Sequence, residues 1–309
     1  MKKLFLFTIL LISFTTFGQK LEWIPFNWLG AEVSGKYFDK FAITIPVTVD
    51  NLPHKFNLQL DLGAYNTIFY ENSINSYLEK YSDLKNKIDT TLTFRMFNKT
   101  HFKLKNVELK LGKVNIGKIN IGIFKNFGDE IPKDSISTKS EKHIGTLAPD
   151  IFQDKILIID YPNKRICITK ELPKKFSKAN FQPFIIKDGR IKIPFNINDK
   201  VENLLFDTGT SLFALMTTEE RANKISANKI VDSLKTSSWG VFYMVYGRQV
   251  NSKIKFGKKV LNPATVFYDK INKHDEFYDK EKIWGITGNA YFLNNIVIID
   301  YKNQRFGVK

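Results

Sequence analysis

The sequence of 309 residues contains the same series of segments twice. Two strand-like runs with a proline at the same place, 43–49 and 191–197, are each followed by a polar turn. A second apolar run then ends in Asp-x-Gly, at Asp61 and at Asp207, 146 positions apart. Further blocks match in the same order, namely 145–148 with 285–288 and the Ile-Ile-Asp-Tyr segments 158–161 and 298–301. We interpret these ordered matches as an internal duplication, which predicts two similar halves.

The two Asp-x-Gly tripeptides suggest a chemistry as well as a fold. A single one would mean little, because Asp and Gly are common in turns. Two of them, each at the end of a strand-like run, suggest two half-sites that each contribute a carboxylate, Asp61 and Asp207. Two carboxylates held close enough to share one proton can activate a water molecule. Gly63 and Gly209 allow a tight loop and a close backbone approach.

The hydrophobic pattern predicts a mostly β structure. Both duplicated runs alternate apolar residues with polar or small ones, which is the period of a half-buried strand. Residues 19–36 are aromatic and irregular and are expected to form an edge strand or a lobe-packing arm. Helical segments are expected at 72–87 and, as its counterpart in the second half, at 218–233. The polar stretch 128–142 has no apolar period and is expected to be a loop.

These blocks together resemble the pepsin-like (retropepsin-like, bilobal) aspartic proteases, of a bacterial exported type. The segment Asp207-Thr208-Gly209-Thr210-Ser211-Leu212 is similar to the second-lobe signature of that family without departure. Asp61-Leu62-Gly63-Ala64 resembles the first-lobe or retroviral-type signature, but Leu62 replaces its threonine. The resemblance implies an all-β, two-lobed fold with a few short helices and an aspartic-type endopeptidase activity.

The same resemblance assigns roles to particular residues. Asp61 and Asp207 would be the catalytic pair, supported by the loop residues around them. Thr208 would hydrogen-bond across to the other lobe, as Leu62 cannot, and Thr210 would reach the Asp207 carboxylate, as Ala64 cannot. The expected loop-support residues are Gly63, Ala64, Thr208, Gly209, Thr210 and Gly288.

A flap over the substrate is part of the family pattern, and there this sequence departs from it. The family carries a flap tyrosine in the first lobe, but residues 93–100 contain none, and Phe97 could cover a substrate without supplying a hydroxyl. Trp239, Tyr243 and Tyr246 occupy the matching region of the second half, where ordinary hairpin packing is the alternative to a substrate-covering role.

Length and terminal composition indicate the organisation of the chain. We expect a signal peptide at 1–18, a first lobe at 19–175 that contains the Asp61 loop, and a second lobe at 176–309 that contains the Asp207 loop. Lys2 and Lys3 precede an apolar run that is short for a membrane span, so cleavage before Gln19 is expected, with an uncleaved anchor as the alternative. Cys167 is the only cysteine, and an exported protein without disulfides fits a bacterial periplasmic or extracellular location.

Composition also limits the partners and cofactors. The net charge is +16, or +14 without Lys2 and Lys3, but the basic residues are scattered, so we expect no nucleic-acid binding. The four histidines have no paired ligand spacing, so no metal site is expected, and no cofactor is required. We expect a monomer without a membrane span after signal cleavage, acting on a peptide or an unfolded protein.

Two hypotheses of function remain open. The first is an exported aspartic endopeptidase that hydrolyses peptide bonds with a water activated between two Asp carboxylates. The second is a non-catalytic pepsin-like protein that binds a peptide or a glycan with a degenerate first lobe. Leu62 beside Asp61 supports the second hypothesis, whereas the paired Asp loops support the first.

Overall fold

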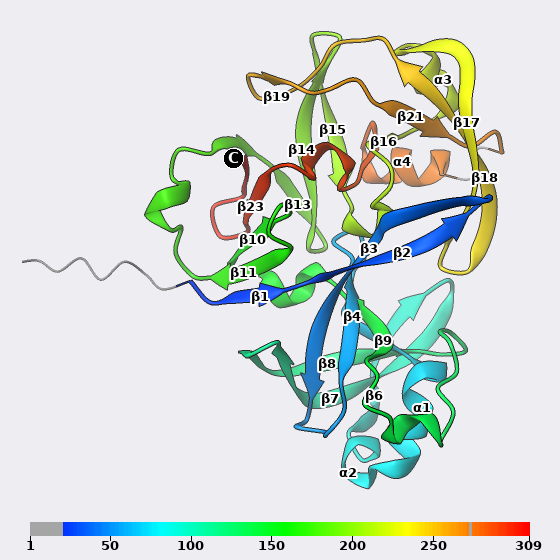
Figure 1. Cartoon of the computed structure of the whole chain (residues 1–309), viewed down its shortest axis with the longest axis vertical. Coiled ribbons are helices and arrows are strands. Elements are labelled where there is room, and N and C mark those ends of the chain that lie inside the picture. The colour runs from blue at the N-terminus through cyan, green and yellow to red at the C-terminus, as the bar shows by residue number, and fades with distance from the viewer. Residues whose placement is uncertain (1–20, 272–273) are drawn as a thin grey trace, which may run out of the picture.

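The computed structural model describes residues 21–271 and 274–309, so the expected signal peptide lies outside the described residues. The chain is built mainly of β-strands, which form three sheets (Figure 1). The all-β expectation is confirmed. Four short α-helices occur among the described residues: α1 (Glu71–Lys80), α2 (Ser82–Lys85), α3 (Glu219–Asn223) and α4 (Asp275–Glu281).

The first half of the chain forms a sheet of eight strands. Its outer strands are long hairpins with a buried apolar face, and its centre holds the short strands that flank the Asp61 loop. In spatial order the strands are β2 (Asn27–Val33), β3 (Lys36–Val49), β4 (Phe56–Leu60), β9 (Lys142–Leu147), β5 (Ile68–Tyr70), β8 (Val114–Phe124), β7 (Lys99–Leu111) and β6 (Ile88–Met96).

The second half forms a sheet of ten strands with the Asp207 loop at its centre. In spatial order these are β17 (Ser226–Ser238), β18 (Val241–Val250), β21 (Thr265–Tyr268), β16 (Leu215–Met216), β22 (Gly285–Thr287), β15 (Lys200–Phe206), β14 (Arg190–Ile197), β19 (Ile254–Phe256) and β20 (Lys259–Val260), with β13 (Ile185–Lys187) paired to β14.

The two sheets repeat the same unusual strand arrangement around each Asp loop. β4 runs parallel to β9, with Leu60 beside Leu147, and β15 runs parallel to β22, with Phe206 beside Thr287. β5 then runs antiparallel to β9, and β16 runs antiparallel to β22. The internal duplication read from the sequence therefore corresponds to a duplicated topology.

A third sheet of six strands joins the halves. Its central pair is β10 with β23, in which Ile158 lies opposite Ile298, so the two copies of the duplicated segment pair with each other. Asp160 and Asp300 at the strand ends are buried, and each accepts a hydrogen bond from the Nε of its own arginine, Arg165 and Arg305, at 2.9 and 2.8 Å. The strands are β1 (Trp23–Pro25), β11 (Arg165–Thr169), β10 (Ile156–Asp160), β23 (Ile296–Asp300), β24 (Arg305–Val308) and β12 (Asn180–Pro183).

The structure confirms some of the remaining expectations from the sequence and contradicts one of them. Residues 23–33 form β1 and β2, and α1 and α2 lie within the expected helical segment 72–87 apart from the first residue of α1. The helix expected at 218–233 is wrong for most of its length. Only α3 is helical, and the chain continues as β17, because Ser226–Ser238 pairs along its length with β18. Tertiary pairing outweighs the helix preference of the charged residues there.

The hairpin of β2 and β3 extends from the first half to the second, where its end lies beside β17 (Figure 1). Lys36 makes a 2.5 Å ion pair with Asp232, and the Ser34 hydroxyl accepts a hydrogen bond from the backbone N–H of Lys235. This arm and the six-stranded sheet both hold the two halves together around the Asp loops.

Candidate active site

Each Asp of the duplicated tripeptide stands one residue beyond a central strand. The backbone N–H of Asp61 donates to the carbonyl of Leu147 at 3.0 Å, and that of Asp207 donates to the carbonyl of Thr287 at 3.0 Å. These two bonds extend the parallel pairing of β4 with β9 and of β15 with β22 by one residue. The position of both carboxyl groups is therefore fixed by backbone pairing, which makes the two loops equivalent.

The two loops face each other so closely that each glycine touches the opposite Asp. A Cβ atom added to Gly63 would lie 2.4 Å from Cγ of Asp207, and one added to Gly209 would lie 2.7 Å from Cγ of Asp61. No side chain fits at either position without a shift, since real Cβ contacts do not fall below 3.0 Å. The structure therefore brings Asp61, Gly63, Asp207 and Gly209 together in one place.

The two carboxyl groups differ in how the protein holds them. Asp61 accepts the backbone N–H groups of Gly63 and Ala64 on one oxygen, Oδ1, at 2.9 and 3.0 Å. Asp207 accepts the N–H of Gly209 on Oδ1 at 2.8 Å and the hydroxyl of Thr210 on Oδ2 at 2.6 Å. Ala64 has no hydroxyl to match Thr210, which leaves Oδ2 of Asp61 available for a proton.

Burial and the facing charge perturb the pKa of Asp61. Desolvation raises the pKa of this carboxyl well above its ordinary value, and the negative charge of Asp207 and a side-chain hydrogen bond with it raise it further. The two backbone N–H groups oppose this change only in part. Two carboxylates this close resist being ionised together, which agrees with the raised pKa of Asp61.

Thr208 crosses from one loop to the other. Its hydroxyl donates to the carbonyl of Leu60 at 2.7 Å and accepts from the backbone N–H of Leu62 at 2.9 Å. The side chain is fully buried. Leu62 occupies the equivalent position of the first half, and its buried side chain packs in the apolar core instead. The two loops are therefore joined by one threonine rather than by a reciprocal pair.

The loop-support position at Gly288 lies directly behind the Asp207 loop. A Cβ atom there would lie 1.9 Å from the backbone oxygen of Thr210, and the N–H of Gly288 donates to the carbonyl of Phe213 at 2.8 Å. Ala148 stands at the equivalent position of the first half and is fully buried. The first half thus accommodates a methyl group where the second half has room only for glycine.

A cleft of about 950 Å³ lies over the two carboxyl groups. Two hairpin tips line it, Phe97 between β6 and β7 and Trp239 between β17 and β18. Both residues have positive φ, 49° and 50°, in two-residue turns of the kind that suit twisted hairpins. The ring of Phe124 has its centroid 6.1 Å from that of Phe97 and 5.8 Å from that of Trp239. Aromatic side chains from both halves therefore meet over the cleft.

Of the two tyrosines that the sequence suggested for the second half of the cleft, only one lines it. Tyr243 lines the cleft, and its ring lies 4.9 Å from that of His274. Burial raises the pKa of its hydroxyl, and the charges of Asp269 and Asp207 add to this effect. Tyr246 is not among the cleft-lining residues and packs its ring against Tyr268. Successive residues of a strand alternate between its faces, so a residue three positions farther on points away from the cleft.

Sequence reasoning missed a buried ionic cluster at one side of the cleft. Arg190, at the start of β14, is 2% exposed and makes a 2.8 Å ion pair with Glu281, and it donates to the hydroxyl of Tyr65 at 2.5 Å. Lys192 makes a second ion pair with Glu281 at 3.1 Å. Burial alone would raise the pKa of the Glu281 carboxyl, but the hydrogen bond from Lys192 and the charges of Arg190 and Lys192 lower it below its ordinary value.

This cluster has no sequence signal, because its members lie far apart in the chain. Tyr65 follows the first Asp loop, Arg190 and Lys192 belong to β14, and Glu281 ends α4. The guanidinium of Arg190 lies 3.8 Å from the ring centroid of Tyr65, so the cluster also connects the two halves beside the cleft.

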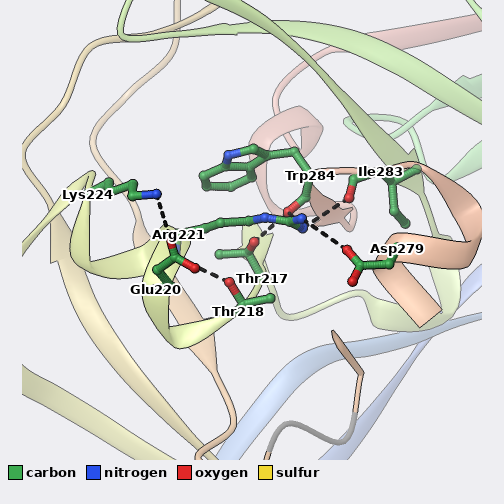
Figure 2. A network of polar contacts seen from close by, with 8 residues as sticks. All are labelled: Thr217, Thr218, Glu220, Arg221, Lys224, Asp279, Ile283 and Trp284. Atoms are coloured by element: carbon green, nitrogen blue, oxygen red, sulfur yellow. Dashed lines mark hydrogen bonds and ion pairs between the residues drawn. The ribbon is translucent and has the colours of Figure 1, made fainter. Parts of the chain in front are cut away.

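Another polar network surrounds Arg221 and holds the residues that precede β22 (Figure 2). Arg221 on α3 donates to the carbonyl groups of Ile283 and Trp284 at 3.1 and 3.0 Å and pairs with Asp279 at 3.5 Å. Thr217 donates to the same Trp284 carbonyl. These bonds fix the chain just before β22, the strand that carries Thr287 and leads to Gly288.

The described part of the chain contains neither a metal-binding cluster nor a membrane-spanning helix. Over residues 21–271 and 274–309, no group of three or more His, Cys, Asp or Glu side chains is placed to hold a metal ion. Across the same residues, no helix is long and apolar enough to cross a membrane.

Comparison with known proteins supports the fold. No protein-family model matches the sequence, and a search of curated proteins finds no match. Among solved structures, an aspartic proteinase from Irpex lacteus is similar, with a TM-score of 0.52 over 94% of this chain and 97% of that chain. The chain therefore has the two-lobed pepsin-like fold. Sequence identity is 13%, so this likeness concerns the fold alone.

Proposed function

We propose that the protein is an aspartic endopeptidase that hydrolyses peptide bonds with a water molecule activated between Asp61 and Asp207. The observation that carries this proposal is the contact of each loop glycine with the opposite Asp carboxyl. Such a contact leaves the two carboxyl groups close enough to share one proton, in a cleft that extends over both halves.

The unequal hydrogen bonding of the two carboxyl groups suggests which of them holds the proton. Both oxygens of Asp207 accept hydrogen bonds from its own loop, which holds this carboxyl in place to accept the proton of the water. Burial and the facing charge of Asp207 favour the protonated form of Asp61. In this assignment Asp207 takes a proton from the bound water, and Asp61 donates its proton to the carbonyl oxygen of the scissile bond.

The reaction needs no covalent intermediate with the protein. The water oxygen attacks the carbonyl carbon as Asp207 accepts the water proton, and the carbonyl oxygen gains the proton of Asp61. The resulting tetrahedral diol collapses when the leaving nitrogen takes the proton from Asp207 and one hydroxyl of the diol returns its proton to Asp61. The C–N bond breaks, a carboxylic acid and an amine leave, and the singly protonated pair is regenerated. Gly63 and Gly209 serve this step because they let the two carboxyl groups approach.

A digestion experiment tests this function. Purified protein without residues 1–18 is incubated with an unfolded protein from acid to neutral pH, and Asp61→Asn and Asp207→Asn variants serve as matched controls. We expect cleavage by the wild type that is lost in both variants. A folded wild-type protein that cleaves nothing at any pH would contradict the proposal.

Leu62 favours a second candidate, a non-catalytic protein that binds a peptide or a glycan in the same cleft. Its side chain cannot return the bond that Thr208 makes across the loops. Under this alternative, wild-type protein binds an unfolded polypeptide or an oligosaccharide without cleaving it, and Leu62→Thr gains activity over an inert parent.

Export to the periplasm or the medium is proposed from the N-terminal sequence, and fractionation of the producing cells tests it.

A further inference from the structure

The floor of the cleft beside Asp61 carries three polar side chains, which the apolar Ile68 borders. Gln59, two residues before Asp61, lies beside Thr146 in the parallel pairing of β4 with β9. The hydroxyl of Thr146 lies 2.6 Å from that of Tyr70, and all three side chains line the cleft. Thr146 and Tyr70 are buried, and Gln59 is half-buried.

The floor of the cleft beside Asp207 is apolar at the equivalent positions. Leu205, two residues before Asp207, lies beside Ile286 in the parallel pairing of β15 with β22. Met216 on β16 pairs with Ile286 and completes this patch, and all three side chains line the cleft. The duplication therefore equates Gln59 with Leu205 and Thr146 with Ile286, so that the same two positions differ only in chemistry.

Within residues 21–271 and 274–309, no other side chain takes up the remaining hydrogen-bonding capacity of these three polar side chains. One of the two hydroxyls at Tyr70 and Thr146 donates to the other, which leaves one O–H and lone pairs for a further partner. Among the described residues, the amide of Gln59 makes no side-chain hydrogen bond. An apolar substrate side chain placed here would displace water and leave these groups unpaired, which is unfavourable.

The same floor also disfavours a charged side chain. Gln59, Tyr70 and Thr146 carry no charge, so a buried ammonium or carboxylate would find no counter-ion among them. An uncharged side chain with a hydroxyl or an amide can both donate and accept, which matches the groups present. Asn, Gln, Ser and Thr meet this condition.

We propose that the two subsites beside the Asp pair select opposite chemistries on the two sides of the scissile bond. The subsite of Gln59, Tyr70 and Thr146 takes Asn, Gln, Ser or Thr, and the subsite of Leu205, Met216 and Ile286 takes a large apolar side chain. This specificity rests on the proposed function. An extended peptide that crosses the Asp pair directs successive side chains to opposite sides, so the two residues that flank the scissile bond enter different subsites.

A variant built from the chain's own second half tests the proposal. Gln59→Leu with Thr146→Ile installs the residue pair that Leu205 and Ile286 already form in the same register, and Tyr70→Phe removes the remaining hydroxyl. Wild type and variant digest a library of peptides that differ only in the two residues flanking the cleaved bond. Leu205→Gln with Ile286→Thr is the reciprocal control.

We expect wild type to cleave between one polar uncharged and one apolar residue, in one order only. In the triple variant, kcat/KM should shift at least about tenfold toward apolar residues on both sides, because the unpaired groups are gone. The reciprocal variant should shift the preference on the other side of the bond. Wild-type preference for two apolar residues or for a charged one, or an unchanged profile in the variants, would overturn the inference.

Binding separates this inference from the proposed function. The Asp207→Asn protein and its version with the three first-half substitutions are titrated with labelled, uncleaved peptides of both kinds. The single variant should bind the polar–apolar peptide at least about tenfold more tightly than the apolar–apolar peptide, and the combined variant should reverse this order. Equal affinities contradict the subsite assignment, whereas the expected affinities without any wild-type cleavage contradict only the enzymatic function.

Discussion

The hydroxyl of Thr208 accepts a hydrogen bond from the backbone N–H of Leu62 at 2.9 Å, across the boundary between the two duplicated loops. Because the same hydroxyl donates to the carbonyl of Leu60, one side chain of the second loop satisfies two backbone groups of the first. The sequence separation of Leu62 and Thr208 is 146 residues, so this bond forms only when both halves have folded.

Replacing Thr208 by Val should destabilise the protein. The shape of the side chain is kept, but two buried backbone groups lose their partner, and each unpaired group costs about 1–3 kcal/mol. We expect the free energy of unfolding in urea to fall by about 2–6 kcal/mol. Leu62→Thr is the control and should stay within about 1 kcal/mol of wild type, since new hydrogen bonds offset lost apolar packing. A Thr208→Val protein as stable as wild type would show that these bonds contribute nothing.

Asp61→Asn should stabilise the protein at neutral pH. Because the pKa of Asp61 is raised in the folded state, the folded protein binds more protons than the unfolded chain above the ordinary value of 3.8. Wild-type stability therefore falls as pH rises through this window, whereas a neutral amide removes the dependence. We expect a higher Tm for the variant near neutral pH and no difference below the unfolded pKa. The exposed Asp39→Asn variant should show no such pH-dependent gain, and an equal gain there would refute the explanation.

Gly63→Ala should disrupt the Asp pair through direct contact with Asp207. The new Cβ would lie 2.4 Å from Cγ of Asp207, so one of the two loops has to move. We expect a loss of peptidase activity of about 100-fold or more, because small displacements of reacting groups have effects of this size. The free energy of unfolding checks the cause, because Gly63→Ala should destabilise the protein less in an Asp207→Ala background than in the wild type. Equal costs in both backgrounds would exclude the contact as the reason.

Glu281→Gln should be among the most destabilising single substitutions in the described chain. It removes the negative charge between Arg190 and Lys192, both of which are buried. Breaking a buried pair in this way costs about 3–5 kcal/mol. Glu79→Gln breaks the exposed pair with Lys133 and should leave the free energy of unfolding nearly unchanged, because exposed ion pairs contribute little to stability. Similar costs for the two variants, measured by urea unfolding, would mean that the cluster is not tightly held.

Trp239→Ala should weaken peptide binding more than it changes stability. Its ring packs against Phe124 and Phe127 from the other half, at 5.8 and 5.9 Å between centroids, over the cleft. We expect the Kd of a peptide bound to the Asp207→Asn protein to rise roughly tenfold, about 1.4 kcal/mol. Phe242 lies on the same hairpin, is exposed and does not line the cleft, so Phe242→Ala should leave the Kd unchanged.

Local patterns in the sequence determined the repeated framework. Alternating apolar residues specify strands because a strand has two faces, and the order of the duplicated blocks specifies two copies of one topology. The positions of Asp61 and Asp207 at strand ends follow from these patterns. Fold and the location of the candidate site were therefore predictable, whereas β17 was not, because its pairing with β18 depends on a partner that local preference does not encode.

Only the tertiary structure decided what surrounds the paired Asp loops. The ion cluster of Arg190 and Glu281 joins residues that no local pattern connects, and the separation of Tyr243 from Tyr246 depends on the face that β18 turns to the cleft. The sequence contains Gln59 and Thr146, but only the register of β4 and β9 shows that the two residues lie side by side near Asp61. Contacts between distant segments form through packing, and packing is a property of the whole fold rather than of any single segment.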